Sequence, residues 1–153
     1  MDTKVNLADL IHRGGVMEID AANTEDAYKK FTAEINLPEG IDSNFLYRAL
    51  CDREHVLSTA VGHGVALPHT RSPIFKEEID QRIYVVYLKN PIDMHAPDSA
   101  PVNVMFVLLT QNNQTHLGVL SSLAGYLNNH NFKKALEIKA NEEKLAAIIR
   151  ELA

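Results

Sequence analysis

The spacing of apolar residues along the chain predicts several helices. Ala27, Phe31 and Ile35 recur every four residues, which places them on one face of a helix. Asn23 or Thr24 caps this helix, and Leu37-Pro38 ends it. Similar patterns with capping residues predict further helices from Asn6 to Ile11, from Asp42 or Ser43 past Arg53, from Thr115 to about Asn129, from Asn131, and from Asn141 onward.

Two other segments predict strands that are buried on both faces. Arg82 to Leu88 contains IYVVYL and Val102 to Leu109 contains VNVMFVLL, both continuously apolar. Shorter strands are predicted for Val16 to Ile19 and for Val61 to Leu67, and the turn-rich segment 91–101 predicts a short hairpin. We therefore predict an α/β fold with a mixed, mostly buried β-sheet and helices packed on both faces. These patterns do not give the order of the strands.

Composition and charge narrow the classes of function. The 153 residues, 46% hydrophobic and 23% charged, suit a single domain spanning 1–153. A net charge of −5 without any basic run argues against nucleic-acid binding. The N-terminus has no signal-peptide pattern, and the longest apolar run, Val104 to Leu109, is too short to insert into a membrane. Cys51 has no partner for an internal disulfide, so we expect a cytoplasmic protein.

The stretch VGHGVALPHT, residues 61–70, places a histidine at the predicted end of a strand. Pro68 has no amide hydrogen, so strand pairing stops on that side and His69 lies where the sheet gives way to a loop. Ligands commonly bind at strand ends in α/β proteins. A neutral imidazole can attack a phosphoryl group and later release it. His69 is the candidate nucleophile, although a hydrogen-bonded structural histidine is also compatible with this pattern.

Phosphoryl transfer requires positive charge and hydrogen-bond donors around the phosphate oxygens. Arg53 lies near the C-terminal end of its predicted helix, on one face with Phe45 and Ala49, and its guanidinium matches phosphate geometry. His116 opens the helix after the VNVMFVLL strand, where a neutral imidazole would have an N–H to donate. Taken alone, Arg53 is also compatible with a surface charge and His116 with a helix-start residue.

The segment REHVLSTAVGHGVALPH, residues 53–69, resembles the active-site segment of the type-2 IIA components of the phosphoenolpyruvate-dependent phosphotransferase system, the fructose–mannitol class. The matching residues are Glu54, Val61, Gly62, Val65, Ala66, Leu67, Pro68 and His69. PIDMHAPDSAPVNVMFVLLT and QTHLGVLSSLA resemble the family's loop, central strand and following helix. The resemblance implies that His69 accepts phosphate from a histidine-containing phosphocarrier protein, that Arg53 and His116 stabilise it, and that no cofactor takes part.

Three residues near His69 in the sequence differ from the family pattern. Thr70 and Arg71 follow His69 where the family usually has a small residue, most often glycine. Thr70 would narrow the approach or donate its hydroxyl to the phosphate, and Arg71 would add a second cation. His63 replaces an asparagine or similar polar residue, and its place between two glycines makes it a candidate partner of the His69 ring. These changes bear on recognition of the phosphate donor more than on the chemistry.

The LADLI…GGVMEID opening resembles the nitrogen-regulatory subgroup of the family. A chain of this length, with no attached IIB, IIC or carrier domain expected, also fits that subgroup. Its members signal through their phosphorylation state, which implies regulatory target proteins as partners. The alternative is a sugar-specific IIA component that passes phosphate to a IIB component during fructose- or mannitol-type uptake.

Two further classes of function remain open from the sequence. His63, His69 and His116 would supply the three nitrogen ligands of an open zinc site. The chain has no cysteine pair and no HExxH motif, and Arg53 would oppose a cation, so we expect no metal. The other class is an interaction module in which His69 is vestigial.

Overall fold

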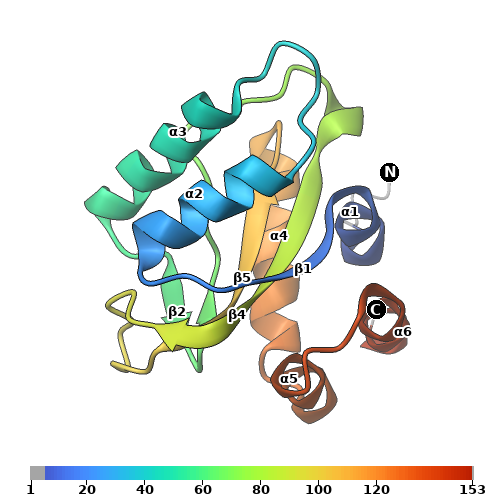
Figure 1. Ribbon diagram of the computed structural model, residues 1–153. Helices are drawn as coiled ribbons and strands as arrows, with labels where there is room; N and C mark the ends of the chain where they lie inside the picture. The colour runs from blue at the N-terminus through green and yellow to red at the C-terminus, as the bar shows by residue number, and fades with distance from the viewer. Residues whose placement is uncertain (1–5, 153) are drawn as a thin grey trace.

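A five-stranded mixed sheet separates two layers of helices (Figure 1). The computed structural model describes residues 6–152, and residues 1–5 and 153 of the predicted domain 1–153 lie outside this range. The strands are β1 (Gly15–Ile19), β2 (Ala60–Gly62), β3 (Val65–Ala66), β4 (Arg82–Ile92) and β5 (Val102–Leu109). Their order across the sheet is β1-β4-β5-β3-β2. The predicted α/β class, with a mixed sheet covered on both faces, is confirmed.

The centre of the sheet is the antiparallel pair β4 and β5, where Val85 lies opposite Phe106 and Val86 opposite Met105. All four side chains are fully buried. Successive side chains of a strand point to opposite faces. Val85 and Phe106 therefore pack in one hydrophobic core, and Val86 and Met105 pack in the other. Burial on both faces explains why these two strands are continuously apolar in sequence.

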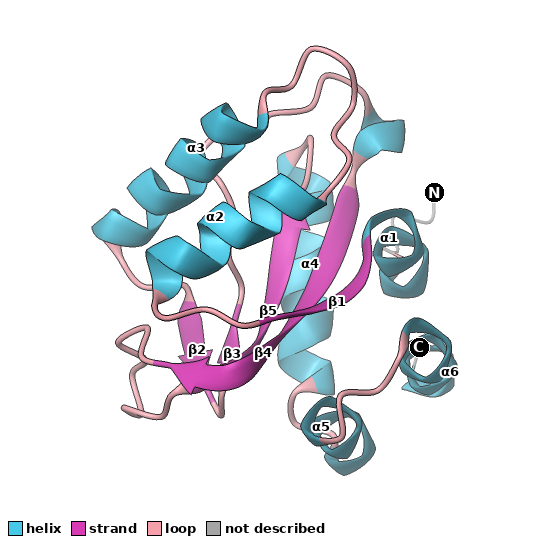
Figure 2. Ribbon diagram, in the orientation of Figure 1, coloured by secondary structure: helices cyan, strands magenta, loops and turns pink. Residues whose placement is uncertain are grey.

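The helices divide between the two faces of the sheet (Figure 2). The helices are α1 (Leu7–Gly14), α2 (Thr24–Glu34), α3 (Ser43–Val56), α4 (Asn113–Tyr126), α5 (His130–Glu137) and α6 (Glu142–Leu152), with a 3-10 turn η1 (Glu78–Asp80) before β4. α2 and α3 cover one face, and the other four α-helices cover the opposite face. No helix within residues 6–152 is both long and apolar enough to cross a bilayer.

Local details differ from the sequence-based predictions. The short hairpin predicted within 91–101 is not present, because β4 extends to Ile92 and pairs with Val102, so that the turn residues connect β4 to β5. On α3 the fully buried residues are Leu46 and Leu50, while Phe45 is 57% exposed. The face of α3 that carries Phe45 is therefore not the face that packs against the core.

The predicted strand at 61–67 is divided by a turn. Gly62, His63 and Gly64 have positive φ angles of 99°, 57° and 79°. Left-handed backbone at three successive residues reverses the chain, and two of the three are glycines, which adopt it without strain. β2 and β3 therefore pair antiparallel with each other, and β3 continues parallel to β5.

Candidate functional site

His69 lies at the edge of the sheet where β3 and β5 both end. Because β3 and β5 are parallel, their carboxyl ends meet at the same edge. The amide of Leu108 donates to the carbonyl of Pro68 at 2.8 Å, and His69 forms an isolated bridge with Leu108. Pro68 has no N–H to donate in return, so regular pairing ends here and the side chain of His69 enters the loop region.

The ring of His69 is held by its own backbone segment. Its Nδ1 lies 2.8 Å from the carbonyl oxygen of Leu67. A carbonyl can only accept, so Nδ1 carries the proton and Nε2 keeps a free lone pair. Burial lowers the pKa of His69; the Leu67 hydrogen bond opposes this shift and the nearby charge of Arg53 adds to it. His69 is thus a neutral, oriented imidazole.

His116 approaches the same point from the first turn of α4. The ring centroids of His69 and His116 are 4.8 Å apart, with a 60° angle between the ring planes. Thr110 Oγ1 lies 3.2 Å from His116 Nδ1. In the tautomer protonated on Nε2, the Thr110 hydroxyl donates to Nδ1, and the Nε2 N–H remains to donate elsewhere. Burial lowers the pKa of His116; a protonated His69 ring would lower it further, and so does the positive charge of Arg53.

Arg53 completes the group from the last turn of α3. Its Nη1 donates to the carbonyl of Leu57 at 2.6 Å, which fixes the guanidinium beyond the end of the helix. Arg53, His69 and His116 line one cavity of about 380 Å³. No aspartate or glutamate among the described residues lines it. The cavity therefore presents a nucleophilic nitrogen beside a cation and further N–H donors, an arrangement suited to an anion.

Comparison with known proteins identifies the family of this chain. Residues 16–152 match the family described as "Phosphoenolpyruvate-dependent sugar phosphotransferase system, EIIA 2". The chain belongs to the EIIA 2 family. It is 34% identical over 115 residues to a "Nitrogen regulatory protein" of Klebsiella oxytoca, covering 73% of this chain and 69% of that protein.

Solved structures agree with this assignment. The crystal structure of nitrogen regulatory protein IIA-Ntr from Neisseria meningitidis superposes with a TM-score of 0.75 at 27% identity, covering 88% of this chain and 91% of that one. The IIA component in a complex of enzyme IIAMTL with phosphorylated enzyme IIBMTL from Escherichia coli shares the fold, with a TM-score of 0.63 at 18% identity over 90% of this chain and 94% of that one. The predicted resemblance to the EIIA 2 family, nearest to its nitrogen-regulatory members, is confirmed.

Thr70 and Arg71 of this EIIA 2 chain both line the cavity of His69. The Thr70 hydroxyl, however, donates to the carbonyl of Ser72 at 2.7 Å. Its single hydrogen is therefore already engaged in a local turn, and the side chain narrows the cavity without offering that hydrogen to a ligand. Arg71 is exposed at the rim.

His63 is the one predicted site residue that the structure does not bring to His69. It lies in the turn between β2 and β3, near the start of β5, and lines a different cavity. The strand that follows it carries the chain away from this turn, so His63 and His69 lie toward opposite ends of the sheet. Within residues 6–152, no three histidine, cysteine or acidic side chains gather in a possible metal site.

A network around Glu54 supports the site and was not predicted from the sequence. The Glu54 carboxylate accepts hydrogen bonds from the Tyr28 hydroxyl at 2.5 Å, the Thr59 amide at 2.7 Å and the Thr59 hydroxyl at 2.8 Å. These bonds tie the end of α3, where Arg53 lies, to α2 and to the start of β2. The acidic residue beside Arg53 was a sequence signal for this position, but its partners are visible only in the fold.

Proposed function

We propose that this EIIA 2 protein is a phosphohistidine relay that accepts a phosphoryl group on Nε2 of His69 from a histidine-containing phosphocarrier protein. The observation that carries the proposal is the hydrogen bond from His69 Nδ1 to the Leu67 carbonyl, in a cavity shared with Arg53 and His116. It leaves Nε2 as the nitrogen with a free lone pair, next to groups that bind phosphate oxygens.

The transfer step is a simple exchange of bonds. The Nε2 lone pair of His69 forms a bond to phosphorus while the phosphorus–nitrogen bond in the donor breaks, and its electron pair returns to the donor's imidazole. The proton on Nδ1 stays in place, where the Leu67 carbonyl stabilises the positive charge that develops on the ring. Arg53 and the Nε2 N–H of His116 hold the transferred oxygens.

The use of the phosphoryl group is proposed from the relatives. Several relatives at 32–34% identity are named nitrogen regulatory proteins, which favours signalling through the phosphorylation state to regulatory target proteins. The family description names a sugar phosphotransferase system, and a "Multiphosphoryl transfer protein" of Shigella flexneri is 26% identical over 132 residues. These matches support the second candidate, a sugar-specific component that passes the phosphoryl group to a IIB component.

Intact-mass spectrometry tests the relay. The full chain is incubated with phosphoenolpyruvate, the system's kinase and a phosphocarrier protein. We expect one acid-labile phosphoryl group on the wild type and none on His69→Gln. We expect Arg53→Ala to slow transfer by about 100- to 1,000-fold, by analogy with loss of one preorganised donor. Arg48→Ala is the matched control, because Arg48 is exposed on the same helix and lies outside the cavity.

An unmodified wild type, or equal labelling of His69→Gln, contradicts the proposal. The phosphorylated protein is then mixed with purified fructose- and mannitol-type IIB domains. Retention of the phosphoryl group supports the regulatory role, and rapid transfer to a IIB domain supports the sugar-specific role.

A further inference from the structure

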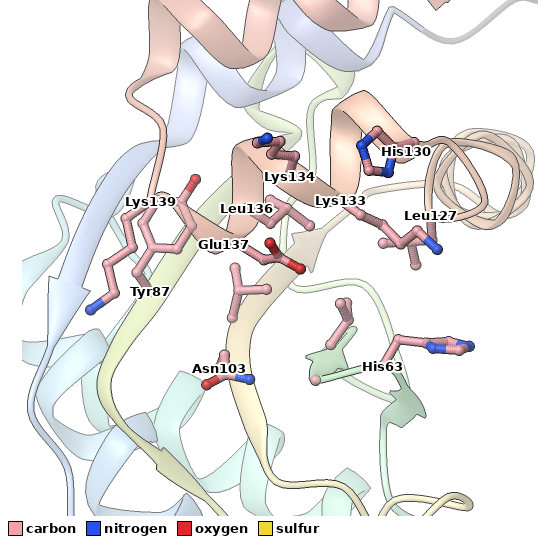
Figure 3. Close-up of a pocket in the computed structure, with 13 residues that line it drawn as sticks. His63, Tyr87, Asn103, Leu127, His130, Lys133, Lys134, Leu136, Glu137 and Lys139 are labelled. Carbon is pink, nitrogen blue, oxygen red and sulfur yellow. The ribbon is translucent and has the colours of Figure 1, made fainter.

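A second cavity, of about 530 Å³, lies between α5, the β2–β3 turn and the start of β5 (Figure 3). It is separate from the cavity of His69. Asn103 and Val104 line it near the start of β5, whereas His69 pairs with Leu108 near the end of the same strand. Five residues of strand correspond to about 17 Å. The volume is in the range of pockets that hold small organic ligands.

Positive side chains gather around this cavity in a protein whose net charge is −5. Three lysines line it against one glutamate. Lys139 pairs with Glu18, but Lys133 and Lys134 form no ion pair with any residue in the 6–152 range. Consecutive side chains of a helix point in different directions, and Figure 3 shows the ammonium ends of Lys133 and Lys134 well apart, so each unpaired lysine is a separate positive charge.

Two imidazole rings accompany the unpaired lysines. Figure 3 shows His63, His130 and the ammonium end of Lys133 on one side of the cavity. The backbone of His63 has a φ of 57°, and its amide donates to the Asp98 carboxylate at 2.8 Å. The turn therefore fixes the backbone position from which the His63 side chain extends. An ammonium group and two imidazoles offer several separate N–H donors, which suits the three terminal oxygens of a phosphate group.

The rest of the cavity suits an organic body bearing hydroxyl groups. Figure 3 shows the Glu137 carboxylate directed into the cavity above Asn103. Glu137 is four residues from Lys133, yet the two are not paired within the described chain, and its oxygens remain able to accept from hydroxyl groups. Leu127 and Leu136 add an apolar wall. The Tyr87 hydroxyl is not available, because it donates to the carbonyl of Ala140.

We propose that this cavity is a second ligand site of the protein, which binds a small phosphate monoester with a hydroxylated organic body. The phosphate lies against Lys133, His63 and His130, and hydroxyl groups of the body reach Glu137 and Asn103. The Glu137 carboxylate repels a second phosphate at that end, so the site selects monoesters over bisphosphates. Sugar phosphates and nucleoside monophosphates share this chemistry.

Amide NMR titration of the 153-residue protein tests the site. The probes are fructose 6-phosphate, adenosine monophosphate, fructose 1,6-bisphosphate and inorganic phosphate. We expect at least one monoester to give saturable shifts centred on residues 63–65, 103–104 and 127–139, at lower concentration than the bisphosphate or inorganic phosphate. The titrations with fructose 6-phosphate and with adenosine monophosphate show whether a sugar or a nucleoside fits the organic part of the site. The absence of saturable shifts with both monoesters, or shifts centred on His69, overturns the proposal, as does equal or tighter binding of inorganic phosphate or the bisphosphate.

Paired variants separate this site from general charge effects. Lys133→Ala should weaken monoester binding by about tenfold or more, because its charge-assisted hydrogen bond to the phosphate is lost. Lys144→Ala is the control, since Lys144 is exposed on α6 and outside the cavity. Arg53→Ala should leave the shifts on α5 unchanged. Equal weakening by Lys144→Ala, or loss of binding in Arg53→Ala, contradicts the assignment.

Discussion

Replacing Glu54 with alanine removes the acceptor of three hydrogen bonds that hold the end of α3 in place. Its donors are the Tyr28 hydroxyl and the amide and hydroxyl of Thr59. Tyr28 is 0% exposed and Thr59 is 5% exposed. The alanine variant leaves these buried donors without partners, which is more costly than losing the bonds themselves.

The magnitude follows from these contacts. Each hydrogen bond to a charged group contributes about 1.5–3 kcal/mol, which gives an upper limit near 9 kcal/mol for three. Glu54 also borders a cavity of about 530 Å³, through which water can reach the freed donors. We therefore expect Glu54→Ala to lower the free energy of unfolding by about 3–5 kcal/mol. This is a large part of the stability of an ordinary domain.

Urea denaturation followed by circular dichroism measures the effect. Glu54→Gln keeps one carbonyl acceptor and should lower the free energy of unfolding by about 1.5–3 kcal/mol. Asp52→Ala is the matched control, because Asp52 is an exposed acidic residue on α3 two positions before Glu54, and it should change the free energy of unfolding by less than about 0.5 kcal/mol. If the free energy of unfolding of Glu54→Ala lies within about 1 kcal/mol of the wild-type value, the reasoning is refuted. The loss of an acceptor by three buried donors would then have had little effect on stability.

Two further predictions concern the histidines and the glycines. His69 and His116 both have lowered pKa values in the fold, so the unfolded chain takes up protons near pH 6.5 that the native protein does not. The free energy of unfolding should therefore fall as the pH drops below about 6.5, less steeply in a His69→Gln/His116→Gln variant; NMR titration midpoints at or above 6.5 would contradict this. A Cβ on Gly14 would lie 2.0 Å from the carbonyl oxygen of Ile83, so Gly14→Ala should prevent folding. Gly125→Ala, with open space around the Cβ, should raise the free energy of unfolding by about 0.5–1 kcal/mol, and thermal melts of both variants check the pair.

The central strands and the helices were predictable because their signals are local. β4 and β5 are buried on both faces, and that burial requires the continuous apolar runs seen in the sequence. Asn23 and Asn141 accept amide hydrogen bonds at the helix starts where capping was predicted. The β2–β3 turn was not predicted, since it depends on left-handed backbone at His63 as well as at its two glycines.

The sequence alone determined the kind of fold and singled out His69, Arg53 and His116 by residue type and position. The sequence-based prediction also placed His63 beside His69, because a separation of six residues along the chain does not show in which direction the backbone runs between them. The tertiary structure decided which of these residues lie together. The parallel pairing of β3 with β5 brings the chain after β3, where His69 lies, close to the start of α4, where His116 lies. Convergence of side chains from segments far apart depends on strand order and helix packing, and those are set by contacts that local patterns do not encode.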